Sequence, residues 1–229
     1  MVLIDVYNKA MQECTKASML VADTNEFYNN HVTSNGTTYS VDLHTCTLDG
    51  AFLTLFMALE NFLESSFVCY MMGQAGLNGN SFARYVLPTS EENAHSILKG
   101  ISKFTDFTNR DTIVKLANNF FDGGGTYVYL NSISTDFEEM KKIRNAISHI
   151  SIESDRAFKG LVRTKLGSLP PNISTSLFLN TTIPGTATTF FIYYRDIVVD
   201  AISNISNPAW TIEALTEQIV SVGALTSLC

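Results

Sequence analysis

The spacing of apolar residues predicts helices along most of the chain. In Leu3–Val21 apolar side chains recur every three or four residues, which places them on one face of a helix. The strongest pattern runs from Leu48 to Met72, where apolar residues step by four and three, and Gly73 follows as a suitable C-cap. Shorter stretches with the same period are Glu91–Phe104, Asp111–Phe121, Thr189–Ser206 and Trp210–Leu225.

A further helix is predicted to begin near Asp136. The segment Thr135–Glu138 has the form of a capping box, and its acidic residues suit the positive N-terminus of a helix. Apolar residues then repeat every three or four positions, at Phe137, Met140, Ile143, Ile147 and Ile150. The second half of this helix contains Arg144-Asn145-Ala146-Ile147-Ser148-His149.

Three segments interrupt the helical pattern. Phe27–Thr47 is rich in Asn, Thr and Ser around a turn signal at Ser34–Thr37, which predicts a small hairpin or an ordered loop. Asp122–Gly125 contains three adjacent glycines that could cradle a phosphate. Since no Lys-Ser/Thr follows, it is not a P-loop, and a flexible connection is the preferred interpretation. Asp155–Thr188 is basic and then rich in Thr, Ser and Pro, which predicts irregular structure.

These elements predict an all-α protein, an up-and-down helical bundle in a single domain covering residues 1–229. The core would comprise about 48–150 and 189–225, and segments 23–47 and 155–188 would be elaborations. The small N-terminal hairpin or loop and the irregular segment before the last helices belong to those elaborations. No internal repeat and no domain boundary is found.

Composition narrows the class of protein. With 229 residues, 45% hydrophobic and 16% charged, the chain is predicted to be globular. No apolar run is expected to span a membrane, because the most apolar segments carry charged side chains, and no basic and then apolar leader opens the sequence. The expected location is cytoplasmic. In the cytoplasm the four cysteines would be reduced thiols, and three of the four would help to fill a core. The four are Cys14, Cys46, Cys69 and Cys229.

The charge is distributed unevenly. The net charge of −7 argues against a broad nucleic-acid surface. From Lys141 to Lys165, however, seven basic and two acidic residues sum to +5, whereas the other 204 residues hold eight basic and twenty acidic ones. The positive charge is therefore concentrated at the Arg144–His149 segment and just after it. The alternative is that this run is only a solvated helix face.

Arginine and histidine together carry chemistry that suits a phosphodiester. Arg144 offers a permanently charged, forked phosphate ligand, and His149 has the one side chain that titrates near neutral pH without help. The spacing alone has a second interpretation without a functional role. Arg144 could lie on a solvated helix face, and His149 could be a C-terminal residue that complements the helix dipole. Continued helical geometry sets the two about 140° apart around the axis, so no contact between them is expected within one chain. Asn145 and His149 would share a face.

The sequence Arg-Asn-Ala-Ile-Ser-His resembles the signature motif of the HEPN superfamily. That signature is Arg-x4–6-His, often with a polar residue after the arginine. An earlier long helix with an aromatic and acidic pair, Ala58–Leu63, is also similar to that family. The resemblance covers about Leu48–His149 and the Thr189–Ser206 helix. One toxin subgroup carries a tyrosine two residues after the histidine. Here that position is Ser151, which argues against the regulation of that subgroup.

The resemblance implies a homodimer in which two motifs form one cleft, and a metal-independent endoribonuclease of a toxin–antitoxin or phage-defence system. RNA would be the substrate, an antitoxin or defence protein a possible partner, and no metal or cofactor is expected. The catalytic residues would be Arg144, His149 and Asn145. Phosphate binding would fall to Lys141, Lys142, Arg156 and Lys159, and Glu60 and Ser148 would lie in the cleft.

Two alternatives stay open. The family also includes non-catalytic modules, so this chain could instead bind a partner protein or a nucleotide. Chemistry elsewhere in the chain is poorly supported. The remaining histidines are isolated and predicted to lie on the surface or in loops, and no nucleophile-elbow pattern is present. These histidines are His31, His44 and His95.

Overall fold

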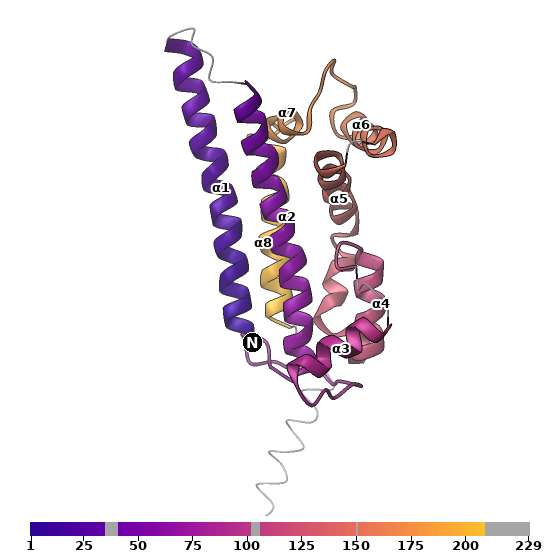
Figure 1. The fold of residues 1–229 in the computed structure, drawn as a ribbon. Helices are drawn as coiled ribbons and strands as arrows, with labels where there is room; N and C mark the ends of the chain where they lie inside the picture. The colour runs from indigo at the N-terminus through magenta and orange to yellow at the C-terminus, as the bar shows by residue number, and fades with distance from the viewer. Residues whose placement is uncertain (35–40, 102–105, 150, 209–229) are drawn as a thin grey trace, which may run out of the picture. The chain divides into compact units, whose positions relative to one another are not determined.

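A computed structural model describes residues 1–34, 41–101, 106–149 and 151–208. Within these ranges the chain is helical, with two isolated β-bridges, Arg84–Phe121 and Thr182–Thr189, and no strand (Figure 1). The all-α prediction is therefore confirmed. The elements are α1 (Leu3–Ser34), α2 (Val41–Met71), α3 (Glu91–Ile101), α4 (Arg110–Phe120), the 3₁₀ segment η1 (Asp122–Asn131), α5 (Ser134–Ser148), α6 (Ile152–Leu166), α7 (Thr175–Asn180) and α8 (Phe190–Ser206).

The chain divides into two compact units. Among the described residues, the first comprises Met1–Tyr7, Phe62–Ser132 and residues 202–208, and the second comprises Asn8–Asn61 and Ile133–Ala201. The division falls within α1, α2 and α8, so no linker separates the units along the chain. The motif helix α5 belongs to the second unit.

The first unit is built around an aromatic cluster centred on Phe67 of α2. Its ring lies 4.8 Å from the ring of Phe121 and 5.0 Å from that of Tyr127, measured between centroids. The hydroxyl groups of Tyr127 and Ser66 are 2.8 Å apart, so this buried phenol is hydrogen-bonded, as burial of a polar group requires.

The three glycines at the start of η1 form a packed turn. Gly123, Gly124 and Gly125 all have positive φ, a conformation that other residues rarely adopt. A Cβ on Gly125 would lie 2.7 Å from Cε2 of Phe82, and Gly124 is itself buried. The prediction of a flexible connection here was wrong, because backbone conformation and close packing require these glycines.

The second unit packs α5 against α6 and α7. Aromatic side chains also link its helices. Phe56 of α2 meets Phe137 of α5 with ring centroids 6.0 Å apart, and Phe178 of α7 stacks on Phe190 of α8 at 4.3 Å. Because these rings are fully buried, the apolar face of α5 is fixed and its polar face is left toward solvent.

The predicted N-terminal hairpin was wrong for the residues that the structure describes. Phe27–Ser34 continues α1, and Val41–Thr47 opens α2. Packing overrides the weak helix propensity of this Asn- and Thr-rich stretch: the ring of Tyr28 in α1 stacks on that of His44 in α2 with centroids 4.4 Å apart, and Nε2 of His44 lies 2.9 Å from Oδ1 of Asn25. The turn centre Asn35–Thr37 lies outside the described residues.

Two boundaries near the motif also differ from prediction. Residues 155–166, predicted to be irregular, belong to helix α6, which ends at Gly167 with φ 72° as a left-handed C-cap. The prediction of a capping box at Thr135–Glu138 was wrong. Helix α5 begins at Ser134, and its N-cap is Ile133, whose side chain makes no capping hydrogen bond. The predicted helix Trp210–Leu225 lies outside the described residues.

Helix α2 is long and apolar enough to cross a membrane by length and composition. The stretch Leu43–Met71 has 29 residues and a most apolar window with mean hydropathy 1.3. The expectation that no run reaches this length was therefore wrong. In that window 61% of the residues are buried within the protein, which is the arrangement of a core helix.

The cysteines follow the prediction only in part. Cys14 and Cys69 are buried thiols, and burial raises the pKa of each to about 11. Cys46 is exposed, so it is not one of the three cysteines predicted to help fill a core. Cys229 lies outside the described residues.

Candidate functional site

The motif lies at the C-terminal end of α5, and the helix ends inside it. Ser148 is the last helical residue, and His149 adopts an extended conformation with φ −130° and ψ 115°. The backbone N–H of His149 still donates to the carbonyl of Asn145 at 2.9 Å, so His149 is the C-cap. Its side chain is exposed and leaves the angular position that a continued helix would give it.

This departure brings the arginine and the histidine together. Nη1 of Arg144 lies 3.3 Å from Nε2 of His149 and 3.1 Å from Oδ1 of Asn145. The expectation that the pair could not meet within one chain was wrong, because it extended helical geometry one residue beyond the end of the helix. Asn145 also contacts Arg144 rather than the imidazole.

The contact can be a hydrogen bond in only one sense. A guanidinium has only donors, so Nε2 of His149 would be the acceptor, as it is in the tautomer that carries its proton on Nδ1. The neutral ring is the form that can take up a proton. Nε and Nη2 of Arg144 make no hydrogen bond with other described residues, so these donors can bind an anion.

The backbone of His149 is held from the other side by α6. Its carbonyl accepts from the backbone N–H of Ser151 at 3.0 Å and from Oγ of Ser154 at 2.7 Å. Ser151 is the N-cap of α6, and its Oγ accepts from the N–H of Ser154 at 3.1 Å. Neither serine was predicted as part of a site, and only the Ser-x-x-Ser spacing hints at the cap.

Comparison with protein-family models, with curated proteins and with solved structures finds no match to this chain. The HEPN resemblance therefore stays a proposal that rests on the residues of the motif.

The seven basic residues of the 141–165 segment have different roles. Lys165 turns inward and pairs with the buried carboxylate of Glu139 at 2.7 Å. That carboxylate also accepts from the hydroxyl of Tyr194 at 3.0 Å, and Nζ of Lys165 lies 5.6 Å from the ring centroid of Tyr193. This group joins α5, α6 and α8. Lys165 is therefore part of the internal packing rather than of a phosphate surface.

The predicted phosphate-binding residues lie on two helices. On α5, Lys141 is half-buried and Lys142 is exposed. On α6, the spacing of Arg156, Lys159 and Arg163 places them on one face, opposite the buried Phe158 and Val162. We call these three residues the α6 basic stripe. Arg163 was not predicted as a site residue, although its spacing from Arg156 indicates this position.

One member of the stripe is already paired. Nζ of Lys159 lies 2.8 Å from Oδ2 of Asp155, one helical turn earlier. Arg156 and Arg163 are exposed and make no ion pair with other described residues. These two arginines are therefore the stronger candidates for phosphate contacts on α6.

The two remaining predicted cleft residues are placed as follows. Ser148 is exposed at the end of α5, beside the motif. Glu60 is half-buried on α2, in the second unit, and its role in the cleft stays a prediction.

The isolated histidines, predicted to lie on the surface or in loops, all lie in helices, and two of them are half-buried. His44 lies in α2, where its Nε2 is 2.9 Å from Oδ1 of Asn25 and its ring stacks on Tyr28 at 4.4 Å. Burial lowers its pKa. His95 is half-buried in α3. His31 lies in α1.

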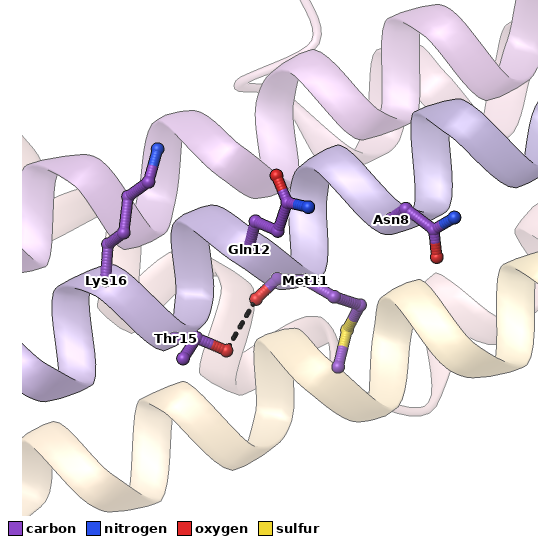
Figure 2. A pocket seen from close by; sticks show the side chains of 5 residues that line it. All are labelled: Asn8, Met11, Gln12, Thr15 and Lys16. Carbon is purple, nitrogen blue, oxygen red and sulfur yellow. Dashed lines mark hydrogen bonds between the residues drawn. The ribbon is translucent and has the colours of Figure 1, made fainter.

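A separate hollow of about 460 Å³ lies on α1 (Figure 2). Its lining residues are Asn8, Met11, Gln12, Thr15 and Lys16. The hydroxyl of Thr15 donates to the carbonyl of Met11 at 2.9 Å, and Lys16 pairs with Glu13, so both groups are already bonded within the helix. The hollow has no proton-transfer group of the kind that the motif offers. Across the described residues no group of three His, Cys, Asp or Glu side chains is arranged to hold a metal ion.

Proposed function

We propose that this protein is an endoribonuclease of HEPN type that cleaves RNA through Arg144 and His149 without a resident metal ion. The observation that carries the proposal is the exposed contact of 3.3 Å between Nη1 of Arg144 and Nε2 of His149. It puts a phosphate ligand and a neutral proton acceptor within reach of one phosphodiester.

The reaction uses the 2′-hydroxyl of the RNA as nucleophile. The oxygen of that hydroxyl bonds to phosphorus, its proton passes to Nε2 of His149, and the bond from phosphorus to the 5′-oxygen breaks. The leaving oxygen takes up a proton from an acid. The products are a 2′,3′-cyclic phosphate and a 5′-hydroxyl. General base and acid steps of this kind contribute typically about 10²- to 10⁴-fold each.

Arg144 supports both the binding and the charge of the transition state. Its unbonded Nε and Nη2 donors offer the fork that suits two phosphate oxygens. When a phosphate oxygen replaces Nε2 of His149 as the acceptor for Nη1, the lone pair of His149 is released to take the proton. Oδ1 of Asn145 still accepts a hydrogen bond from Nη1 of the same guanidinium, which restricts the orientation of that group.

Two chains would complete the site. One histidine serves one proton-transfer role at a time, so a base and an acid call for His149 from each of two protomers. The homodimer therefore rests on the count of proton-transfer groups and on the HEPN resemblance, since Arg144 and His149 meet within one chain. A toxin or phage-defence role in the cytoplasm, restrained by a partner protein, follows from the same resemblance.

The α6 basic stripe offers a path for the RNA backbone away from the motif. Arg156 and Arg163 are about 10 Å apart along α6, at a rise of about 1.5 Å per residue. They lie on the helix that follows His149 directly. Phosphate contacts of this kind position a strand without reading its bases, so cleavage specificity would come from other contacts.

The decisive experiment incubates purified protein with a 5′-labelled RNA in the presence of EDTA. Cleavage that leaves 2′,3′-cyclic phosphate ends, and that is lost in H149A and R144A, is expected. The control H95A changes a half-buried histidine of α3, in the first unit, and should cleave like the wild type. Cleavage that persists in H149A, or that needs added metal, would contradict the proposal.

A further inference from the structure

We infer that Ser154 is a positioning residue for His149, acting through a hydrogen bond from its hydroxyl to the His149 carbonyl. The inference rests on the proposed role of the Arg144–His149 pair. Oγ of Ser154 lies 2.7 Å from that carbonyl oxygen, which is the shortest of its contacts. The hydroxyl has one proton to donate, and the geometry assigns it to His149.

The conformation of His149 is what this bond holds in place. In a continued helix, the carbonyl of His149 would point along the axis and its ring would be turned about 140° from Arg144. In the extended conformation the carbonyl turns toward α6, where Ser151 N–H and Ser154 Oγ both donate to it. The change in φ of the same residue, to −130°, turns the Cα–Cβ bond away from its helical direction, and the ring lies against Nη1 of Arg144. The bond to Ser154 and the contact with Arg144 are thus two ends of one backbone conformation.

Ser154 can be changed without removing the helix cap. The cap is the bond from the N–H of Ser154 to Oγ of Ser151, and an alanine at position 154 keeps that N–H. Ser151 is a poorer choice, because its substitution removes the side-chain cap of α6 itself. S154A therefore deletes one hydroxyl and leaves α6 with its N-terminus satisfied.

A matched control lies on the same helix. The hydroxyl of Thr164 donates at 3.1 Å to the carbonyl of Gly160, within α6 itself, and contacts no residue of the motif. T164A removes the same kind of group from the same helix. S154T restores a hydroxyl at position 154.

The first measurement reads the imidazole directly by NMR of ¹⁵N-labelled histidine. In the wild type, His149 is expected to hold its proton on Nδ1, with Nε2 as the acceptor of Arg144. S154A should move both ring nitrogen shifts toward those of R144A, in which the donor is gone. T164A should leave them unchanged, and S154T should restore them. Unchanged shifts in S154A would overturn the inference, as would an equal change in T164A.

The second measurement is RNA cleavage by the full chain. S154A should lower kcat about 10-fold with little change in KM, because misplacing a proton acceptor costs rate more than binding. S154A with wild-type kcat would overturn the inference. If the shifts respond as expected but no variant cleaves RNA, Ser154 positions His149 and the ribonuclease proposal fails. If cleavage needs Arg144 and His149 while S154A behaves as wild type in both measurements, the ribonuclease proposal holds and the inference fails.

Discussion

Nη1 of Arg144 lies 3.3 Å from Nε2 of His149, five positions along the chain. The contact is exposed to solvent, so it contributes little to the stability of the fold. In the proposed reaction its importance is chemical, because it holds a proton acceptor beside a phosphate ligand. The following predictions test this pair and its surroundings.

Two substitutions of Arg144 should distinguish the contribution of its positive charge to cleavage from that of its forked shape. R144K keeps the positive charge but loses the fork, and we expect kcat/KM for RNA to fall about 10- to 100-fold. R144Q should fall further, by about 10²- to 10³-fold, as for the loss of a donor to a developing negative charge. Thermal unfolding of both variants should match the wild type, and R110K in α4 should not affect cleavage. A rate for R144K equal to that of the wild type would show that the fork is not used.

The α6 basic stripe should determine how RNA binding depends on salt. Each phosphate contact to a single strand contributes about 0.7 to the slope of log K against log salt. R156A and R163A should each reduce that slope by about this amount, measured by fluorescence anisotropy with a short RNA and H149A as the background. K115A changes an exposed lysine of α4 in the first unit and should leave the slope unaltered. Equal slopes in all of these variants would place the RNA elsewhere.

The Glu139–Lys165 pair should contribute more to stability than the pair on the surface of α6. K165M leaves the buried carboxylate of Glu139 without its cation, at a cost of about 2 kcal/mol in the free energy of unfolding. K159M breaks the exposed pair with Asp155 and should cost less than about 0.5 kcal/mol. Urea unfolding of both variants measures the difference. Equal costs would mean that Glu139 finds water or another donor.

His44 should make the fold sensitive to mild acid. Burial lowers its pKa below the ordinary value of 6.5, so below about pH 6.5 the unfolded chain binds a proton that the folded chain resists. The stability contributed by neutral His44 is present above that pH and is lost as the pH falls through the lowered pKa. The free energy of unfolding of the wild type should therefore fall more between pH 7.5 and 5.5 than that of H44Q. H95Q should follow the wild type, and identical pH dependence of H44Q and wild type would contradict this account.

The periodicity of apolar residues was enough to predict most of the helices. It predicted α5 because Phe137, Met140 and Ile143 are buried on one face, and burial imposes the period that the sequence shows. It did not predict where α5 ends. Apolar residues continue to Ile150 in the sequence, but the ending at Ser148 depends on a backbone turn and on Ser151 and Ser154 of the next helix. A single residue at a helix end changed the predicted relation of Arg144 to His149.

The hairpin prediction failed for a different reason. Local composition favours a turn in 27–47, but contacts between the two helices stabilise them instead. Tyr28 of α1 stacks on His44 of α2. Contacts with the later chain flank the segment on both sides, from Asn25 to Asn180 and from Asp49 to Thr175. Such contacts have no local signature, so the length of α1 and α2 was underestimated. The excess of basic residues in 141–165 was predicted, but the separate role of Lys165 was not, since only the structure shows it paired with Glu139.

The early end of α5 also determines how two defective copies of the gene would combine. If the protein acts as the proposed homodimer, a cell that makes both R144A and H149A chains contains mixed dimers in which no chain holds an intact pair, because Arg144 and His149 meet within one chain. Such a cell should show no intragenic complementation. An enzyme whose arginine and histidine met only across the dimer would regain a working pair in the same mixture. The backbone conformation at the end of α5 thus predicts the result of a genetic complementation test.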